Sequence, residues 1–400
     1  MHSGRRNPIV QRFTMSDRPI YLDYQAHTPI DPRVLSLLVE AYALEGNPHS
    51  SHGHGAVARE AVERARVQVA DLIGVRSAEV VFTSGATESN NLALSGLAAH
   101  LSAISRPRVL VSAGEHPSVI AAATAARRLG CEFDLLPLGP DGLVDLGRLA
   151  DHVDDSVGLV SISAANHEVG SISNLQEIVA VCHAAGSLVH SDLSQAAGSI
   201  PLSAADLDLA SFSAHKLYGP SGIGALYVRR SLRSKLAAQI LGGGQEGGLR
   251  AGTLPVALCV AFGAACELVR CELGREASRI EALRDELLDT LLQIPGATLN
   301  GARLPRLPGN INVRFEGVDA EALLVAVKDT VSISSGSACT SIRLEPSHVL
   351  LAMGLSEEEA EESVRIGLGR WTTPDHVEIA NEAITAAVAS LRNTRWRMEA

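Results

Sequence analysis

Three short segments carry side chains able to do chemistry, and each follows an apolar, β-branched run. The first, Thr83-Ser84-Gly85-Ala86-Thr87-Glu88-Ser89, combines a glycine that permits close backbone approach, a hydroxyl, and a helix start that favours an anion. In the second, Asp192 ends an apolar run and Gln195 follows three residues later; an acid placed there can pair with a pyridinium nitrogen. The third, Ser213-Ala214-His215-Lys216, places a lysine where it can be desolvated and form a Schiff base.

Each segment alone has an ordinary structural explanation, namely a capped helix, a turn, or a solvated lysine. Taken together and in this order, they predict a site for pyridoxal phosphate (PLP). The Schiff-base lysine and the acid facing the ring nitrogen are both required parts of that cofactor's electron sink.

The elements that must position these residues alternate between strand and helix from about residue 75 to 245. We expect strands at 79–83, 108–112, 158–163, 188–192 and 209–213, and helices at 89–103, 119–128, 175–185 and around Gln195. This alternation predicts a mostly parallel α/β sheet, whose ligand site lies at the carboxyl ends of the strands.

The second half of the chain has fewer strands. A long helix after Thr253-Leu254-Pro255 is expected to run to Leu292 with a break near Gly274. Strands at 310–315, 332–334 and 364–367, between helices at 320–328, 347–353 and 374–391, then predict a smaller α+β domain.

Composition narrows the class of protein. The 400 residues hold 34 Lys and Arg against 45 Asp and Glu, a net charge of −11, which argues against a nucleic-acid coat or a membrane-surface binder. No apolar run approaches the ~20 residues of a membrane span. The six cysteines include no C-x-x-C pair, which favours a reducing compartment, and we predict a cytoplasmic protein.

Several residues have simpler structural explanations. Cys259, Cys266 and Cys271 are expected to be buried helix cysteines. His49, His52 and His54 lack an accompanying carboxylate and are expected on a surface loop, so no metal site is predicted, and His348 and His376 are expected to face solvent.

The sequence resembles the cysteine desulfurases of the fold-type I PLP enzymes, in the class V aminotransferase group, from about residue 20 to residue 391. The matching stretches are 23–26, 46–52, 83–91, 115–116, 190–192, 212–220, 250–255 and 334–341. The most discriminating is Ser334-Ser335-Gly336-Ser337-Ala338-Cys339-Thr340-Ser341, which matches the segment that holds the family's persulfide-forming cysteine. The stretch from Cys339 to Arg365 resembles the long-loop branch used in iron–sulfur cluster assembly.

The resemblance implies a role for each matching residue. Lys216 would be the Schiff-base lysine and the acid/base at Cα, Cys339 the nucleophile, and His116 the residue that stacks on the ring and assists proton transfer. The other implied cofactor contacts are Asp192 to the ring nitrogen, Gln195 to the ring hydroxyl, and Ala86, Thr87, Ser213 and His215 to the phosphate. Thr253 would reach the phosphate of a neighbouring subunit, and Asn47 and Arg365 would hold the substrate carboxylate.

This chain departs from the family's pattern at three places. His167 stands where the family usually has an Asn that contacts the ring hydroxyl, and His167 is predicted to be a cofactor-binding residue in its place. His27 stands where Thr is common, and the chain stops at Ala400 without the longer tail that many relatives use for a scaffold partner. These differences leave the reaction intact and weaken the assignment of the sulfur acceptor.

The predicted fold is that of a fold-type I PLP-dependent transferase, with a mostly parallel sheet of the seven-stranded type and a smaller α+β domain. Residues 1–18 are expected to be a disordered arm, residues 19–255 the large PLP-binding domain, with an N-terminal segment that joins the small domain, and residues 256–400 the linker helix and the small domain that carries the catalytic cysteine.

The predicted function is conversion of L-cysteine to L-alanine by a homodimer, with sulfur passing to Cys339 and then to an acceptor protein. Iron–sulfur assembly, tRNA thiolation and DNA phosphorothioation stay open as pathways. Direct nucleic-acid or membrane binding is not expected. The alternatives are another fold-type I enzyme, such as an aminotransferase or a selenocysteine lyase, which would place no sulfur on Cys339, and a non-catalytic scaffold, which would need neither Lys216 nor Asp192.

Overall fold

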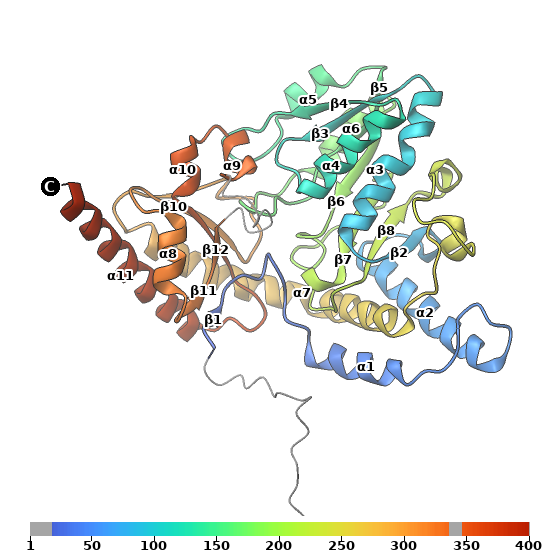
Figure 1. Ribbon diagram of the computed structural model, residues 1–400, viewed down its shortest axis with the longest axis horizontal. Coiled ribbons are helices and arrows are strands. Elements are labelled where there is room, and N and C mark those ends of the chain that lie inside the picture. Colours follow the sequence, from blue (N-terminus) through green and yellow to red (C-terminus); the bar gives the residue numbers. More distant parts are fainter. Residues whose placement is uncertain (1–17, 336–345, 400) are drawn as a thin grey trace, which may run out of the picture.

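The computed structural model describes residues 18–335 and 346–399 and shows two lobes joined by one long helix (Figure 1). The larger lobe is built on a seven-stranded sheet of order β2-β8-β7-β6-β5-β3-β4. Its strands are β2 (Val80–Thr83), β3 (Arg108–Ser112), β4 (Glu132–Leu136), β5 (Val157–Ser161), β6 (Leu188–Asp192), β7 (Leu209–Ser213) and β8 (Gly224–Val228). The five strands β4, β3, β5, β6 and β7 run parallel, and β8 runs antiparallel to both β7 and β2.

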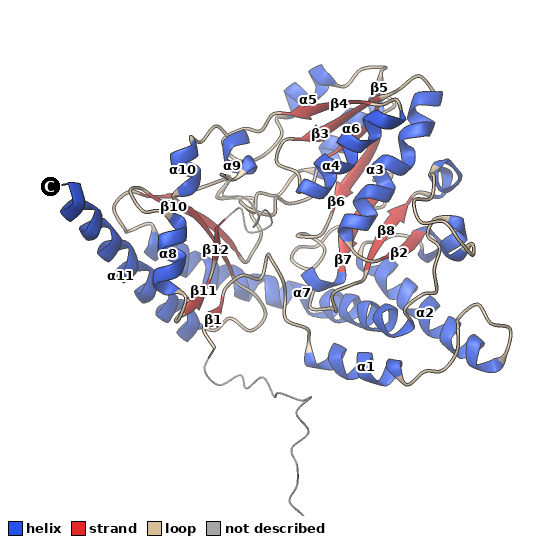
Figure 2. Ribbon diagram, viewed as in Figure 1, coloured by secondary structure: helices blue, strands red, loops and turns tan. Residues whose placement is uncertain are grey.

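Helices cover both faces of this sheet (Figure 2). One face packs against α3 (Ala86–Ala103) and α4 (Pro117–Ala126), and the other against α2 (Gly53–Leu72), α5 (Leu146–His152), α6 (Leu175–Ala184) and the first half of α7 (Val256–Leu291). Neighbouring strand residues divide between the two cores: Val81 lies in the core under α3 and Phe82 in the core under α7. Because both faces are buried, the strands are apolar at consecutive positions rather than alternating.

The smaller lobe has an antiparallel sheet of order β12-β13-β10-β9. Its elements are β9 (Ala297–Leu299), β10 (Asn310–Phe315), α8 (Ala320–Val327), β12 (Ser334–Ser335), α9 (His348–Ala352), α10 (Glu357–Glu361), β13 (Ser363–Gly367) and α11 (Pro374–Glu399). Near the N-terminus, β1 (Ile20–Tyr21) pairs in parallel with β11 (Val331–Ser332) before the chain enters α1 (Pro32–Tyr42) of the large lobe.

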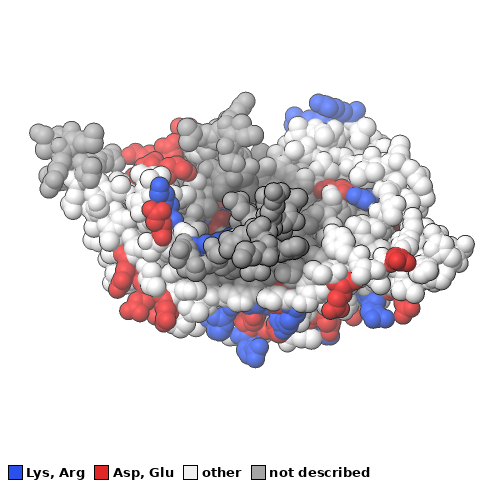
Figure 3. Space-filling view, turned by 60° about the horizontal axis from the view of Figure 1, so that its bottom comes forward, with Lys and Arg blue, Asp and Glu red and all other residues white. Residues whose placement is uncertain are grey.

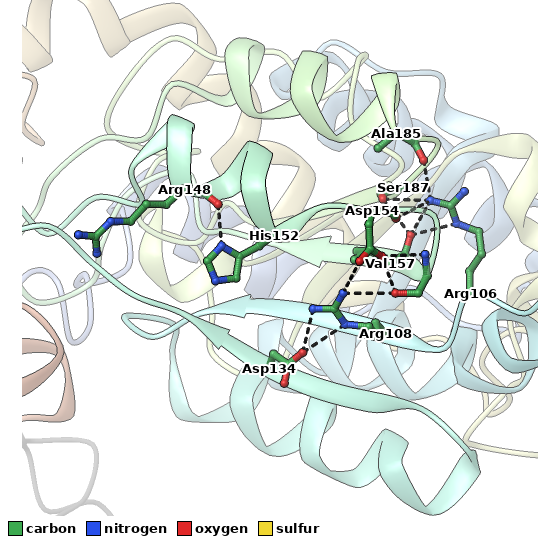
Figure 4. A network of polar contacts seen from close by, with 10 residues as sticks. Arg106, Arg108, Asp134, Arg148, His152, Asp154, Val157, Ala185 and Ser187 are labelled. Carbon is green, nitrogen blue, oxygen red and sulfur yellow. Dashed lines mark hydrogen bonds and ion pairs between the residues drawn. The ribbon is translucent and has the colours of Figure 1, made fainter.

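Arginine side chains fasten the amino ends of the large sheet (Figure 4). Arg106 donates through Nη2 to the carbonyls of Val157 at 2.8 Å and Ala185 at 2.6 Å. Arg108 forms ion pairs with Asp154 at 2.9 Å and Asp134 at 3.2 Å. These contacts occupy the amino edge of the sheet, and the opposite, carboxyl edge faces the small lobe.

The predicted fold class is confirmed, and the strands at 108–112, 188–192, 209–213 and 310–315 have the predicted bounds. The expected break near Gly274 is wrong: α7 runs on through it, since an exposed glycine costs a helix only about 1 kcal/mol. The segment around Gln195 forms turns instead of a helix, and the sequence analysis did not find β4 or β8.

Cys259 and Cys266 are buried as predicted, but Cys271 is exposed. Five residues turn a helix by about 500°, so Cys271 lies about 140° around α7 from Cys266. The expected N-terminal arm lies outside the described residues, apart from Arg18. In the part of the chain that the structure describes, no helix combines the length and the apolar composition of a membrane span.

Candidate active site

A cavity of about 470 Å³ lies at the carboxyl ends of β6 and β7, between the two lobes. The structure brings most of the predicted site residues to its wall: Ala86, Thr87, His116, His167, Asp192, Gln195, Ser213, His215, Lys216 and Arg365. Asn47 and Thr253 do not line it and are exposed in the single chain. Cys339 lies outside the described residues.

One end of the cavity is suited to a phosphate. The N-terminus of α3 opens into it at Ala86 and Thr87, and the residue before the helix, Gly85, provides no side-chain cap for its N–H groups. A Cβ on Gly224 would come within 2.6 Å of the Gly85 Cα, so this turn packs closely on β8. The Ser213 Oγ is buried and has no hydrogen-bond partner among the described residues, so a donor is left for an anion.

Glu88, in the first turn of α3, is a site residue that the sequence analysis did not assign. It accepts from Ser84 N at 2.8 Å and from Arg250 Nε at 3.0 Å, which fixes Arg250 beside the phosphate end of the cavity. Burial opposes ionisation of Glu88, but the hydrogen bonds from Arg250 and Ser84 lower its pKa below the usual value. The only signal in the sequence was an acid at a helix start, which is common.

Asp192 is held rigidly at the end of β6. Its Oδ1 accepts from Ser194 N at 2.9 Å and its Oδ2 from Asn90 Nδ2 at 2.8 Å, and the residue is 7% exposed. Gln195, in the following turns, donates to the carbonyl of Gln25 at 3.0 Å. A fixed carboxylate in the wall of this cavity matches what a protonated pyridine nitrogen requires.

Lys216 lies in a short 3-10 turn, Ala214–Lys216, directly after β7. Its ammonium donates to the carbonyl of Ala26 at 2.8 Å and also to that of Gln25, so the N-terminal segment reaches the lysine of the large lobe. Beside it, the His215 ring stacks on His27 with centroids 5.7 Å apart. Burial, with Lys216 and His27 nearby, lowers the pKa of His215 to about 4, so its ring is neutral at pH 7.

His116 and His167 face each other edge to face in the cavity wall, with ring centroids 5.4 Å apart. Burial lowers the pKa of His167 well below its usual value, and the neighbouring His116, His348, Arg365 and Lys216 add to this shift. The expectation that His348 faces solvent is wrong. Its ring lies 6.3 Å from that of His167, and its Nε2 donates to the carbonyl of Glu115 at 2.9 Å, because α9 packs back against the large lobe.

Arg365 comes from β13 of the small lobe and closes the other side of the cavity. Its Nη1 donates to the His167 carbonyl at 3.0 Å, and its Nη2 to Asp23 Oδ1 and Ser334 Oγ, both at 2.9 Å. Its buried Nε has no partner among the described residues. The guanidinium is thus oriented by both lobes and retains a donor for a bound carboxylate.

Comparison with known proteins assigns the family. The model of the family described as aminotransferase class-V matches residues 20–379. The chain belongs to the class-V aminotransferase family. A cysteine desulfurase IscS from Rickettsia africae (strain ESF-5) is 43% identical over 399 residues, which are 98% of this chain and 96% of that protein.

Solved structures agree with this assignment. A protein described as NifS-like superposes with a TM-score of 0.86 at 33% identity, over 93% of this chain and 99% of that one. SspA in complex with cysteine superposes with a TM-score of 0.78 at 33% identity, over 88% of this chain and 100% of that one. The predicted resemblance and the predicted enzyme class, a cysteine desulfurase of the PLP-dependent class-V family, are confirmed by these relatives.

Proposed function

We propose that this class-V family member converts L-cysteine to L-alanine and moves the sulfur to Cys339. The observation that carries this proposal is the joining, in one cavity, of the Lys216 amine, the Asp192 carboxylate, the open N-terminus of α3 and the Arg365 guanidinium. The substrate C–S bond breaks, the Cys339 thiolate forms an S–S bond to the departing sulfur, and the carbon fragment leaves as alanine after protonation. Cysteine and an enzyme thiol thus become alanine and an enzyme persulfide without any external oxidant.

The donor set fits PLP. We assign Lys216 to the covalent link, Asp192 to the ring nitrogen, and the α3 amides with Ser213 and His215 to the phosphate. When bound, PLP supplies an electron sink for the electrons released at the substrate Cα. The protein's own contribution is a lysine amine at Cα, a fixed carboxylate and an enclosed wall.

Arg365 gives the site its preference for an α-amino acid. The unpartnered Nε of Arg365 is a donor that a ligand carboxylate could satisfy. The SspA relative was solved in complex with cysteine. We assign L-cysteine as the substrate, held at its carboxylate by Arg365, with Asn47 contributing as the family resemblance implies. Arg365→Lys should therefore raise KM for cysteine more than it lowers kcat, since one ammonium cannot both keep the contacts to His167, Asp23 and Ser334 and present a further donor to the carboxylate.

The thiol at Cys339 separates a desulfurase from its rivals. Cys339→Ser should keep PLP and bind cysteine but release no sulfide, because sulfur removal needs a thiolate nucleophile. Cys271→Ser, at an exposed cysteine on α7, is the matched control and should behave as the wild type. Labelled sulfur from cysteine, followed by mass spectrometry of the intact chain, identifies the site. Sulfide from the Cys339→Ser protein at the wild-type rate would contradict the proposal, and alanine formation without labelled Cys339 would favour a lyase.

We also propose that the active protein is a homodimer in which Thr253 completes the phosphate site of the partner. Thr253 is exposed and absent from its own cavity wall, and the nearby loop exposes Leu241 to 83%. Figure 3 shows many charged side chains along the lower edge of the face it draws, with smaller groups at its left, right and upper right, and uncharged surface between them. Sedimentation should give two chains per particle, and Leu241→Asp should shift it toward one chain. Leu304→Asp, at a 71% exposed position of the small lobe, should not.

We expect the sulfur acceptor to be a protein that takes the outer sulfur of the Cys339 persulfide directly. Iron–sulfur assembly, tRNA thiolation and DNA phosphorothioation are the three pathways that fit this chemistry. Transfer of label from sulfur-labelled cysteine to a co-purifying protein distinguishes them, because each pathway uses a different acceptor. A cytoplasmic location, without direct nucleic-acid binding, stays our prediction.

A further inference from the structure

A chain of hydrogen bonds joins Asp192 to His116 through two residues that have no assigned role, Asn90 and Ser118. Asn90 Nδ2 donates to Asp192 Oδ2 at 2.8 Å and to Ser118 Oγ at 3.0 Å. Ser118 Oγ in turn lies 2.8 Å from Nδ1 of His116. Asn90 is fully buried and Ser118 and Asp192 are nearly so, which strengthens these contacts relative to the same contacts in water.

The direction of each hydrogen bond follows from Asp192. An ionised carboxylate only accepts, so the amide nitrogen of Asn90, and not its oxygen, must face Asp192. The same nitrogen also donates to Ser118 Oγ, which uses one of that oxygen's two lone pairs and leaves the hydroxyl proton able to donate to His116. The backbone N–H of Ser118 donates to the same Nδ1 at 3.1 Å.

The Nδ1 of His116 thus faces two donors and has no room for a proton of its own. We propose that Asn90 and Ser118 are positioning residues that hold His116 as the neutral tautomer with its proton on Nε2. Burial lowers the pKa of His116, and the nearby Lys216 and His348 lower it further against the opposing charge of Asp192, which agrees with a neutral ring. Since His116 lines the cavity, Nε2 is the nitrogen left for a bound group.

This inference rests on the proposed function and refines it. A neutral imidazole protonated at Nε2 donates a hydrogen bond to a group at the ring face and has no lone pair there to act as a base. The proton on the substrate Cα is therefore left to the amine of Lys216. The negative charge of Asp192 sets the proton position on His116 through Asn90 and Ser118, so the two cofactor-facing groups act as one unit.

The test measures the protons directly, in the full-length protein with ¹⁵N-labelled histidine. The ¹⁵N shifts of the two ring nitrogens distinguish a protonated from an unprotonated atom, and His116→Gln identifies which signals belong to His116. Between about pH 6 and 8, the wild type should show protonated Nε2 and unprotonated Nδ1, with PLP and without it. Protonated Nδ1 in the wild type would overturn the inference without any variant.

Asn90→Asp reverses the chain, because a carboxylate oxygen in that place must accept from the Ser118 hydroxyl. Proton density on His116 should then move toward Nδ1, and its pKa should rise, because a second negative charge lies nearby. Asn91→Asp is the matched control. Asn91 Nδ2 donates to the Thr87 carbonyl at 2.9 Å and takes no part in the chain of hydrogen bonds, so the ¹⁵N shifts of His116 should not change. Ser118→Ala removes the hydroxyl donor and keeps the backbone donor, so part of the proton density on His116 should move to Nδ1. An unchanged tautomer in Ser118→Ala would overturn the role of Ser118.

Equal His116 shifts in Asn90→Asp and Asn91→Asp would overturn the role of Asn90. The result is independent of the reaction, because the PLP-free protein reports it. Failure of the desulfurase assay with a correct tautomer would count against the proposed function alone.

Discussion

Loss of the Glu246 charge is expected to destabilise the large lobe. Its carboxylate forms a two-armed ion pair with Arg66, at 2.7 and 2.8 Å, and accepts from Phe82 N at 2.7 Å. Both partners are nearly buried: the side chains of Arg66 and Glu246 are 9% and 2% exposed. Removing one partner from a buried ion pair costs about 3–5 kcal/mol, because the other charge is left uncompensated.

Glu246→Gln should fall at the lower end of that range, near ~3 kcal/mol, since Arg66 keeps contacts of 3.2–3.3 Å with Glu63. Equilibrium urea unfolding at one fixed protein concentration measures the loss. Glu63→Gln is the control, because Glu63 is 58% exposed and an exposed partner is worth under about 1 kcal/mol. Adding Arg66→Met to Glu246→Gln should restore at least half of the lost free energy, since no buried charge remains.

A Glu246→Gln protein no less stable than Glu63→Gln would refute the reasoning. The effect should also reach the site, because Glu246 anchors the loop that carries Arg250 to α2 and β2. Binding of PLP should weaken in Glu246→Gln, and fluorescence titration of the PLP-free protein measures that change.

Three further outcomes are expected. Lys216→Ala should lose the absorbance near about 420 nm and the borohydride-reducible link to PLP, and retention of both would remove the basis of the proposed function. Burial, aided by the charge of Asp192, raises the pKa of Glu115 from 4.5 to about 8, so the folded state binds a proton that the unfolded state releases between about pH 5 and 8. The free energy of unfolding should therefore fall over this pH range. Glu115→Gln should reduce that fall in urea unfolding, and parallel curves of unfolding free energy against pH for the two proteins would contradict it. His167→Asn should shift the pH titration of the visible spectrum relative to the wild type, whereas superimposable titrations would make His167 structural filler.

Much of the fold could be predicted because the strands of a doubly covered sheet are apolar throughout. The strand at 188–192 had clear bounds, with apolar residues followed by the polar residues of the site. The missed β4 has four of five residues partly or fully exposed, so its composition resembles a loop. At Gly274 the sequence wrongly predicted a break, because the free-energy cost of one surface glycine is too small to interrupt a 36-residue helix.

Site residues could be predicted where the residue type and its neighbours in sequence indicate a chemical role. They could not be predicted where the role depends on contacts that only the folded chain makes. Lys216 and Asp192 stand at strand ends with recognisable neighbours, but Asn90 is one polar residue among several in α3. Only the fold brings Asn90 within 2.8 Å of Asp192, 102 residues later in the chain. His348 shows the same limit, since its burial depends on how α9 packs against Glu115.

The N-terminal segment links the two lobes, whose hydrophobic cores are distinct, at one site. β1 lies beside β11 of the small lobe and pairs with it (Figure 1). A few residues later, Thr28 Oγ1 donates to the His215 carbonyl of the large lobe at 2.9 Å. Between these anchors, the Gln25 and Ala26 carbonyls accept from the Lys216 ammonium. A shift of the small lobe would therefore move the lysine's hydrogen-bond partners as well as Arg365. The proposed covalent link at Lys216 and the proposed carboxylate contact of Arg365 are thus positioned by the same nine residues, 20–28. The segment therefore belongs to the site, although we assign no catalytic group to it.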